Sequence, residues 1–155
     1  MKAIRVGTAQ FEARDGDKAY NLDVIARLAA QAKSDGAELV CFHECSIGGY
    51  TYLETLDRAG LDTVAEEVPD GPSIQRLIGI AREAGVSIGA GLIERADGRL
   101  YNTYAVVSPE GLAARHRKIH AFVNDALSCG DSYTVFDHLG CRIGILICYD
   151  NNLPE

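Results

Sequence analysis

Three side chains that could cooperate in acyl transfer each follow a strand-like segment of the sequence: Glu44, Lys118 and Cys148. A free thiol has a pKa of about 8.5 and is mostly protonated at neutral pH, so a nucleophilic cysteine needs a base within reach. A carboxylate in a closed pocket can serve, because desolvation raises its pKa toward neutrality. A cation placed opposite can stabilise a thiolate or an oxyanion. The three residue types therefore suit thiol acyl transfer.

Cys148 taken alone does not establish a nucleophile. Free cysteine is among the most frequently buried residue types, so an inert buried thiol is the ordinary interpretation. However, the β-branched run 141–147 ends abruptly in Cys148-Tyr149-Asp150, which predicts a buried strand that delivers the thiol to a turn. A side chain in such a turn can meet a substrate. The presence of Glu44 and Lys118 at the ends of other strands favours the reactive interpretation.

The remaining cysteines do not indicate a disulfide scaffold. The five cysteines form an odd set without dense spacing, which favours reduced thiols. Strand alternation would place Cys41, His43 and Cys45 on one face, so a redox or metal-binding thiol protein is an alternative. Three alternating ligands on an extended strand would need strong bending to converge on one ion. We therefore expect neither a metal nor a cofactor.

Size and charge restrict the class of protein. The chain has 155 residues, of which 47% are hydrophobic and 24% charged, as in an ordinary globular domain. Its net charge of −7 disfavours binding to nucleic acid or to an anionic membrane surface. No apolar stretch approaches the roughly 20 residues of a membrane helix, and the N-terminus has no signal-peptide core. These features predict a cytoplasmic protein without nucleic-acid or membrane partners.

The first third of the chain predicts a β-α-β unit. Residues 3–10 are strand-like, residues 18–34 carry apolar side chains at helical spacing, and residues 38–42 form the next strand. Gly48-Gly49 then breaks the chain. The segment 50–68 is ambiguous and permits short helices. Such a unit favours a parallel strand pair.

The rest of the chain predicts one more helix and then consecutive strands. Ser73 can cap a helix that runs through Glu83. Strands are expected at residues 86–93, 102–108, 112–117, 133–137 and 141–147, with turns at 96–98 and 109–111 and a loop at 121–132. This order predicts a layered α/β domain with a mixed sheet. Residues 151–155 resemble the start of another element, so we expect residues 1–155 to form a single domain that is incomplete at its C-terminus.

Four segments, taken in order, resemble the nitrilase or carbon–nitrogen hydrolase superfamily. They are Val6-Gly7-Thr8-Ala9-Gln10, Phe42-His43-Glu44 leading to Gly49-Tyr50, Arg117-Lys118-Ile119-His120, and Gly144-Ile145-Leu146-Ile147-Cys148-Tyr149-Asp150. Each segment alone is a weak signal, but four in order with credible intervals are specific. The resemblance implies an α-β-β-α sandwich of which this chain holds the N-terminal part.

The resemblance also implies a role for each candidate. Glu44 would be the general base and later the general acid, and Cys148 would attack the substrate carbon. Lys118 would stabilise the tetrahedral intermediate, with the backbone N–H of Tyr149 as second donor. Ammonia or an amine would leave, and water would hydrolyse the thioester.

Two departures from the family pattern concern the surroundings of these residues. His43 stands where the family commonly has proline before its glutamate, which loosens the backbone at that turn. Many members have a second glutamate soon after the Lys-x-His segment, whereas residues 121–128 contain none, and Asp125 is the nearest acidic candidate. His116 and His120 are expected to orient or pack rather than to act as bases.

The sequence thus predicts a cysteine-dependent hydrolase that cleaves a non-peptide carbon–nitrogen bond in a small amide. Cys148-Tyr149-Asp150 resembles the amidase branch, and Tyr50, Tyr149 and Asn151 are expected to line the substrate pocket. A nitrilase or an N-carbamoyl hydrolase of the same family is the alternative. A catalytically silent fragment or subunit that binds a partner through an exposed sheet edge is another. Family members usually pair through sandwich helices, so a homo-oligomer is expected for the full-length protein.

Overall fold

Two β-sheets and four α-helices make up the described part of the chain, residues 3–122 and 124–153 of the computed structural model. The elements in chain order are β1 (Val6–Thr8), α1 (Lys18–Ser34), β2 (Leu39–Cys41), α2 (Tyr50–Thr55), α3 (Arg58–Val64), α4 (Pro72–Ala84), β3 (Ser87–Ala96), β4 (Arg99–Ser108), β5 (Gly111–Arg117), β6 (Thr134–His138), β7 (Cys141–Ile145) and the 3₁₀ turn η1 (Cys148–Asn152).

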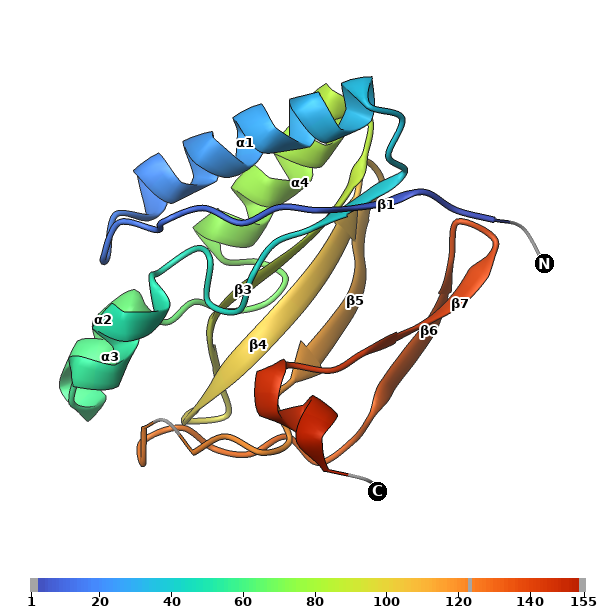
Figure 1. Cartoon of the computed structure of the whole chain (residues 1–155). Coiled ribbons are helices and arrows are strands. Elements are labelled where there is room, and N and C mark those ends of the chain that lie inside the picture. The colour runs from blue at the N-terminus through green and yellow to red at the C-terminus, as the bar shows by residue number, and fades with distance from the viewer. Residues whose placement is uncertain (1–2, 123, 154–155) are drawn as a thin grey trace.

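The larger sheet has the strand order β1-β2-β3-β4-β5. Strands β1, β2 and β3 are parallel, while β4 and β5 are antiparallel to their neighbours, so the predicted mixed sheet is confirmed. Helices α1 and α4 cover one face of this sheet (Figure 1). The antiparallel hairpin β6–β7 lies over the other face. The described elements therefore stack as one helical layer and two sheet layers.

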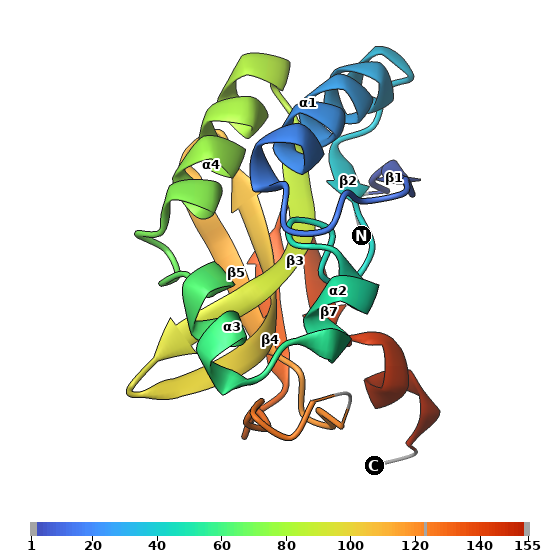
Figure 2. The same ribbon diagram turned by 90° about the vertical axis from the view of Figure 1, so that its left-hand side faces the viewer.

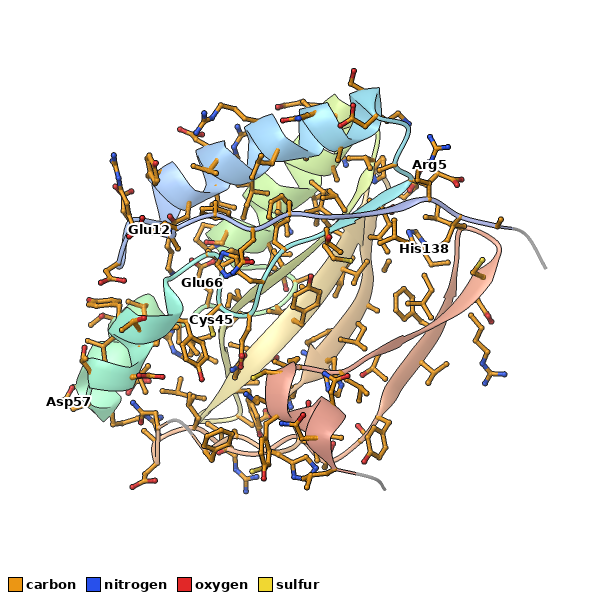
Figure 3. The ribbon with its side chains drawn as sticks, viewed as in Figure 1. Arg5, Glu12, Cys45, Asp57, Glu66 and His138 are labelled. Carbon is orange, nitrogen blue, oxygen red and sulfur yellow. The ribbon has the colours of Figure 1, made fainter. Side chains whose placement is uncertain are left out.

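Local contacts and residue types explain where helices α1 and α4 begin and where α4 ends. The side chain of Asp17 accepts a hydrogen bond from the N–H of Tyr20 at the start of α1. Helix α4 starts with Pro72 in its first turn and ends at Gly85, whose φ of 65° is the left-handed conformation that glycine tolerates. Glu66 binds the start of α4, where it accepts hydrogen bonds from the N–H and the hydroxyl of Ser73, both at 2.7 Å (Figure 3).

Three apolar clusters hold the described elements together, and the third of them packs Leu53 of α2 and Leu61 of α3 against the larger sheet. The first lies between the helices and the larger sheet and contains Ile25, Leu77 and Ile88, all fully buried. The second lies between the two sheets and includes Val106 and Ile145. Burying such side chains is the main favourable contribution to folding, about 1.5–3 kcal/mol for each large aliphatic group.

A polar contact also joins the two sheets. The hydroxyl of Ser87, at the start of β3, lies 2.8 Å from Nε2 of His138 at the end of β6 (Figure 3). The opposite face of the hairpin is open, since Val135 in β6 is 55% exposed and Leu146, the residue directly after β7, is 46% exposed. One side of β6–β7 therefore packs on the larger sheet while the other faces solvent.

Several predicted strands are shorter in the structure than the sequence suggested. The first strand covers Val6–Thr8 rather than residues 3–10, and the last strand ends at Ile145 rather than at residue 147. The strand predicted at residues 38–42 ends at Cys41, because a turn begins before Cys45. The strand alternation assumed for a cysteine and histidine metal site therefore does not continue to Cys45.

The loop and helix predictions fit better. The ambiguous segment 50–68 forms the short helices α2 and α3, and the predicted turn at residues 96–98 has Asp97 and Gly98 with φ of 52° and 72°. None of the helices in residues 3–122 and 124–153 has the length and apolar composition needed to cross a lipid bilayer.

Candidate active site

Glu44 lies in a tight turn that follows β2. The N–H of Ser46 donates to the carbonyl of His43 at 3.3 Å, and the N–H of Gly48 donates to the carbonyl of Cys45 at 3.1 Å. Cys45 has a φ of 52°, an uncommon value for a residue with a side chain. Figure 3 shows Cys45 on this loop, between the sheet and α2. The turn therefore projects the Glu44 side chain beyond the end of the parallel strands.

The turn is possible because it rests on a glycine of β3. A Cβ atom at Gly91 would lie 2.3 Å from the backbone nitrogen of Cys45, far inside contact distance. The carbonyl of Gly91 accepts the N–H of Ile47 at 3.1 Å, and its N–H donates to the hydroxyl of Ser46 at 3.3 Å. Gly91 thus sets how closely the Glu44 turn approaches the sheet.

We expect Gly91→Ala to displace this turn. Because the clash is with backbone and not with a flexible side chain, the substitution should lower the free energy of unfolding by about 1–3 kcal/mol. Gly79→Ala is the matched control, since its Cβ would meet nothing closer than 3.9 Å in helix α4. The control should raise stability by about 0.5–1 kcal/mol. Chemical denaturation measures both, and equal stability of the two variants would contradict the close-approach argument.

Glu44 is held by two side chains from neighbouring strands. Its Oε1 atom accepts hydrogen bonds from Nζ of Lys118 at 2.7 Å and from Nδ2 of Asn102 at 2.6 Å. The Lys118 side chain is 1% exposed and that of Glu44 is 13% exposed. Lys118 continues the pairing of β4 with β5, because its N–H donates to the carbonyl of Asn102 at 2.8 Å. The ammonium and the carboxylate are therefore fixed opposite each other by the sheet register.

Burial makes the Glu44–Lys118 pair interdependent. An isolated ammonium group away from water carries a large desolvation cost, and an adjacent carboxylate offsets much of it. The neighbouring thiol of Cys45 stays neutral, because burial first and the negative charge of Glu44 second raise its pKa far above the usual value. Cys45 is thus an unsuitable nucleophile, although it is adjacent to Glu44 in sequence.

Cys148 is exposed and is the first residue of η1. Its φ is 48°, so the thiol sits on a backbone conformation that non-glycine residues seldom adopt. Cys148 and Glu44 line the same cavity of about 280 Å³ between the two sheets, together with Tyr104 and residues 143–147. In Figures 1 and 2 the turn η1 and helix α2 lie at the same end of the larger sheet.

Asp150 fastens the Cys148 turn to the segment that carries the lysine. Its Oδ2 atom accepts the N–H of Ile147 at 3.1 Å and lies 3.4 Å from Nε2 of His116, while Oδ1 accepts the N–H of His120 at 3.0 Å. Burial alone would raise the pKa of Asp150, but these hydrogen bonds outweigh it and lower the pKa below its usual value. His116 and His120 flank Lys118, so Asp150 aligns the thiol turn with that residue.

Tyr50 is near both the carboxylate and the thiol. It starts helix α2 and is half-buried. Burial first, and then nearby negative charge, chiefly that of Glu44, raise the pKa of its phenol to about 12. Tyr50 is therefore a neutral hydroxyl beside the predicted site.

The other predicted pocket residues are more exposed. Tyr149 is 38% exposed and packs edge-to-face on Phe122 with ring centroids 5.0 Å apart. The amide of Asn151 donates to the carbonyl of Cys148 at 3.1 Å. Asp125 is exposed on the loop that follows Lys118. The structure thus places Asn151 against the Cys148 turn, and Glu44 against Lys118 and in one cavity with Cys148.

Two residues that the sequence did not single out take part in this arrangement. Asn102 contacts Glu44, and Asp150 holds the Cys148 turn. Asn102 could have been found only from the register of β4 with β5. That register places Asn102 opposite Lys118, but it is known only once the strands are paired. The signal for Asp150 is weaker, because the N–H groups that donate to its carboxylate are brought to it only in the folded turn.

The alternative metal site finds no support among residues 3–122 and 124–153, which contain no group of three His, Cys, Asp or Glu side chains arranged to hold an ion. His43 instead has Nδ1 at 3.1 Å from the carbonyl of Glu44, and the thiol of Cys45 donates to Oδ1 of Asn102 at 3.6 Å. Two of the three candidate ligands are therefore engaged in the Glu44 turn itself.

Residues 5–155 match the carbon–nitrogen hydrolase family, to which the chain therefore belongs. An (R)-stereoselective amidase from a Pseudomonas species is 35% identical over 154 residues, which are 98% of this chain and 54% of that protein. An omega-amidase from Xenopus tropicalis is 36% identical over 170 residues, covering 100% of this chain and 58% of that protein. A nitrilase from Pyrococcus abyssi is 32% identical over 155 residues, which cover 98% of this chain and 58% of that protein.

Solved structures agree on the fold. A carbon–nitrogen hydrolase superfamily protein from Xanthomonas campestris superimposes with a TM-score of 0.83 at 23% identity, covering 99% of this chain and 56% of that one. An amidase from a Nesterenkonia species gives a TM-score of 0.76 at 24% identity, and the superposition covers 94% of this chain and 56% of that one. The predicted family and fold class are confirmed. The chain spans about half the length of the relatives it matches.

Proposed function

We propose that the complete protein containing this chain hydrolyses the carbon–nitrogen bond of a small amide through a thioacyl intermediate on Cys148. The observation that carries the proposal is the buried Glu44–Lys118 pair, whose carboxylate lines the same cavity as the exposed thiol. A base, a cation and a nucleophile are the groups that thiol acyl transfer requires. Membership of the carbon–nitrogen hydrolase family supports the same chemistry.

In the proposed reaction Glu44 takes the thiol proton as Cys148 attacks the amide carbon. The carbonyl oxygen becomes an oxyanion, which Lys118 and the N–H of Tyr149 stabilise. When the tetrahedral intermediate collapses, Glu44 gives its proton to the departing nitrogen, and ammonia or an amine leaves. Glu44 then takes a proton from water, whose oxygen attacks the thioester carbon. When this second intermediate collapses, the carbon–sulfur bond breaks and Glu44 returns the proton to the sulfur, which releases the carboxylic acid and restores the thiol and the carboxylate.

The relatives favour an amide over a nitrile as substrate. Amidases and omega-amidases are among the similar proteins, and solved structures of Nesterenkonia amidase variants contain butyramide or acrylamide. One of those structures holds the product of Michael addition of acrylamide at its active-site cysteine. The Pyrococcus nitrilase supports the alternative, in which a nitrile is the substrate. An N-carbamoyl compound is a further candidate of the same chemistry.

The proposal also includes the residues that contact the substrate, the location of the protein in the cell and its assembly. Tyr50, Tyr149 and Asn151 contact the substrate, and Asp125 substitutes for the family's second glutamate. The complete protein is a cytoplasmic homo-oligomer that binds neither nucleic acid nor membrane. Residues 1–155 are one part of a longer hydrolase domain. The competing proposal is a catalytically silent subunit that pairs through an exposed strand edge.

A substrate panel tests the proposal. Ammonia release from butyramide, from dicarboxylic acid monoamides, from N-carbamoyl amino acids and from aliphatic nitriles is measured with the complete gene product. We expect the highest kcat/KM for one of the amides. A nitrile as best substrate would contradict the amidase proposal. A cooperatively folded protein that turns over no member of the panel would favour the silent subunit.

A further inference from the structure

We propose that Asn102 is a positioning residue for Glu44, fixing its carboxylate so that one oxygen is held by donors and the other exchanges the proton with the thiol. This inference rests on the proposed function, in which Glu44 is the base. Asn102 is 4% exposed and comes from β4, a different strand from those that precede Glu44 and Cys148.

The hydrogen bonds at Glu44 are unequally distributed between its two oxygens. Oε1 accepts both Nζ of Lys118 at 2.7 Å and Nδ2 of Asn102 at 2.6 Å. Within residues 3–122 and 124–153, Oε2 accepts no side-chain hydrogen bond. Two donors occupy the lone pairs of Oε1. Oε2 is therefore the oxygen that remains available to take a proton.

The orientation of the Asn102 amide is determined by a neighbouring thiol. Cys45 donates its S–H to Oδ1 of Asn102 at 3.6 Å, and this thiol is 2% exposed. Because burial and the charge of Glu44 raise the pKa of this thiol, it keeps its S–H, which can donate to the amide oxygen. The amide oxygen must face Cys45, which turns the NH₂ group toward Glu44. The reverse orientation would bring two oxygen acceptors within 2.6 Å of each other.

The backbone of Asn102 binds the other partner of the ion pair. Its carbonyl accepts the N–H of Lys118 at 2.8 Å. One residue therefore fixes the carboxylate through its side chain and the lysine through its main chain. In a site from which water is largely excluded, such bonds restrict rotation of the carboxylate strongly. Without the amide, the carboxylate could rotate and offer either oxygen to Lys118.

The test compares Asn102→Ala and Asn102→Asp with the wild-type protein, using the complete gene product and its best amide substrate. Loss of the amide should lower kcat by about 100-fold with little change in KM, because the base is no longer aligned. Asn102→Asp places a second carboxylate beside Glu44, which raises the pKa of the base. The acidic limb of the kcat/KM profile should therefore move to higher pH. A purely structural residue would not move that limb.

Controls separate positioning from folding. Asn124→Ala removes a comparable amide, which donates to the carbonyls of Leu53 and Leu56, and should leave the pH profile unchanged. If the Asn102 variants do not fold, Cys45→Ala and Cys45→Ser replace them. The alanine variant should lower kcat, and the serine variant should restore it, because its hydroxyl can donate to the amide oxygen.

Different results would contradict the inference about Asn102 and the proposed function. Wild-type kcat and pH profile in Asn102→Ala, or in Cys45→Ala if that pair replaces it, would overturn the inference even if Cys148 proves essential. Full activity after loss of the Cys148 thiol would instead overturn the proposed function on which the inference rests.

Discussion

Replacing Cys148 with alanine is expected to lower kcat for amide hydrolysis by about 10³-fold or more, because in the proposed mechanism the thioacyl intermediate forms on this thiol. The thiol is exposed, so its removal should leave the melting temperature nearly unchanged. Ammonia release and a thermal melt of the complete gene product measure the two effects. Cys148→Ser should also be inactive, since a serine hydroxyl at this site is a much weaker nucleophile than a thiolate.

Cys129→Ala is the matched control, because this thiol is also exposed and has no part in the proposed mechanism. It should retain wild-type kcat. If Cys148→Ala kept a substantial fraction of activity, or if Cys129→Ala lost it, Cys148 would not be the acyl acceptor. The comparison also excludes a general effect of removing one cysteine.

The largest effect on stability is expected at Glu94 in β3. Its carboxylate is 1% exposed and accepts hydrogen bonds from Arg117 at 2.7 and 2.9 Å, from Arg115 at 2.8 Å and from Thr103 at 2.7 Å. Glu94→Ala leaves two arginines without their carboxylate. Because both guanidinium groups can still reach water, we expect a loss of about 2–4 kcal/mol rather than the full cost of a buried charge. Urea denaturation measures it.

The same carboxylate predicts a pH dependence of stability. Burial opposes ionisation of Glu94, but hydrogen bonds from Arg117 and Thr103 and the positive charge of Arg115 outweigh it and hold the pKa below the usual 4.5. A lowered pKa in the folded state contributes stability above the unfolded value, and this contribution is lost as the pH falls. The wild-type free energy of unfolding should thus decline below about pH 4.5, and less steeply in Glu94→Ala.

Glu83→Ala is the control for Glu94. Its side chain is 69% exposed, and its pairing with Arg76 at 3.3 Å lies on the surface of α4. We expect a change within about 0.5 kcal/mol. Equal losses in the two variants would show that the Glu94 cluster contributes no more than a surface pair.

Much of the fold could be predicted from sequence because its signals are local. The helix at residues 18–34 and the β-α-β order follow from apolar spacing, and the turn at Asp97-Gly98 follows from its residue types. The end of β2 could not be predicted in this way. It depends on Gly91, which is distant in sequence and allows the Glu44 turn to approach the sheet. A local pattern contains no information about such a contact.

The candidate site, like the fold, could be predicted from the sequence only in part. Glu44, Lys118 and Cys148 could be proposed because their residue types and order suit one chemistry. Asn102 and Asp150 could not, because an amide or carboxylate acquires its role from partners brought together by folding. Asn102 lies 58 residues from Glu44, and Asp150 lies 30 residues from His120. Strand register and turn geometry, rather than composition, place them.

Mass spectrometry of the complete gene product during turnover tests the central claim most directly. The protein is mixed with excess amide substrate, quenched in acid and digested, and the peptide containing Cys148 is examined. We predict a mass increase equal to the acyl group of the substrate on Cys148, and its absence when Cys148 is replaced by serine. An active enzyme whose Cys148 stays unmodified, or whose acyl group lies on another residue, would contradict the account.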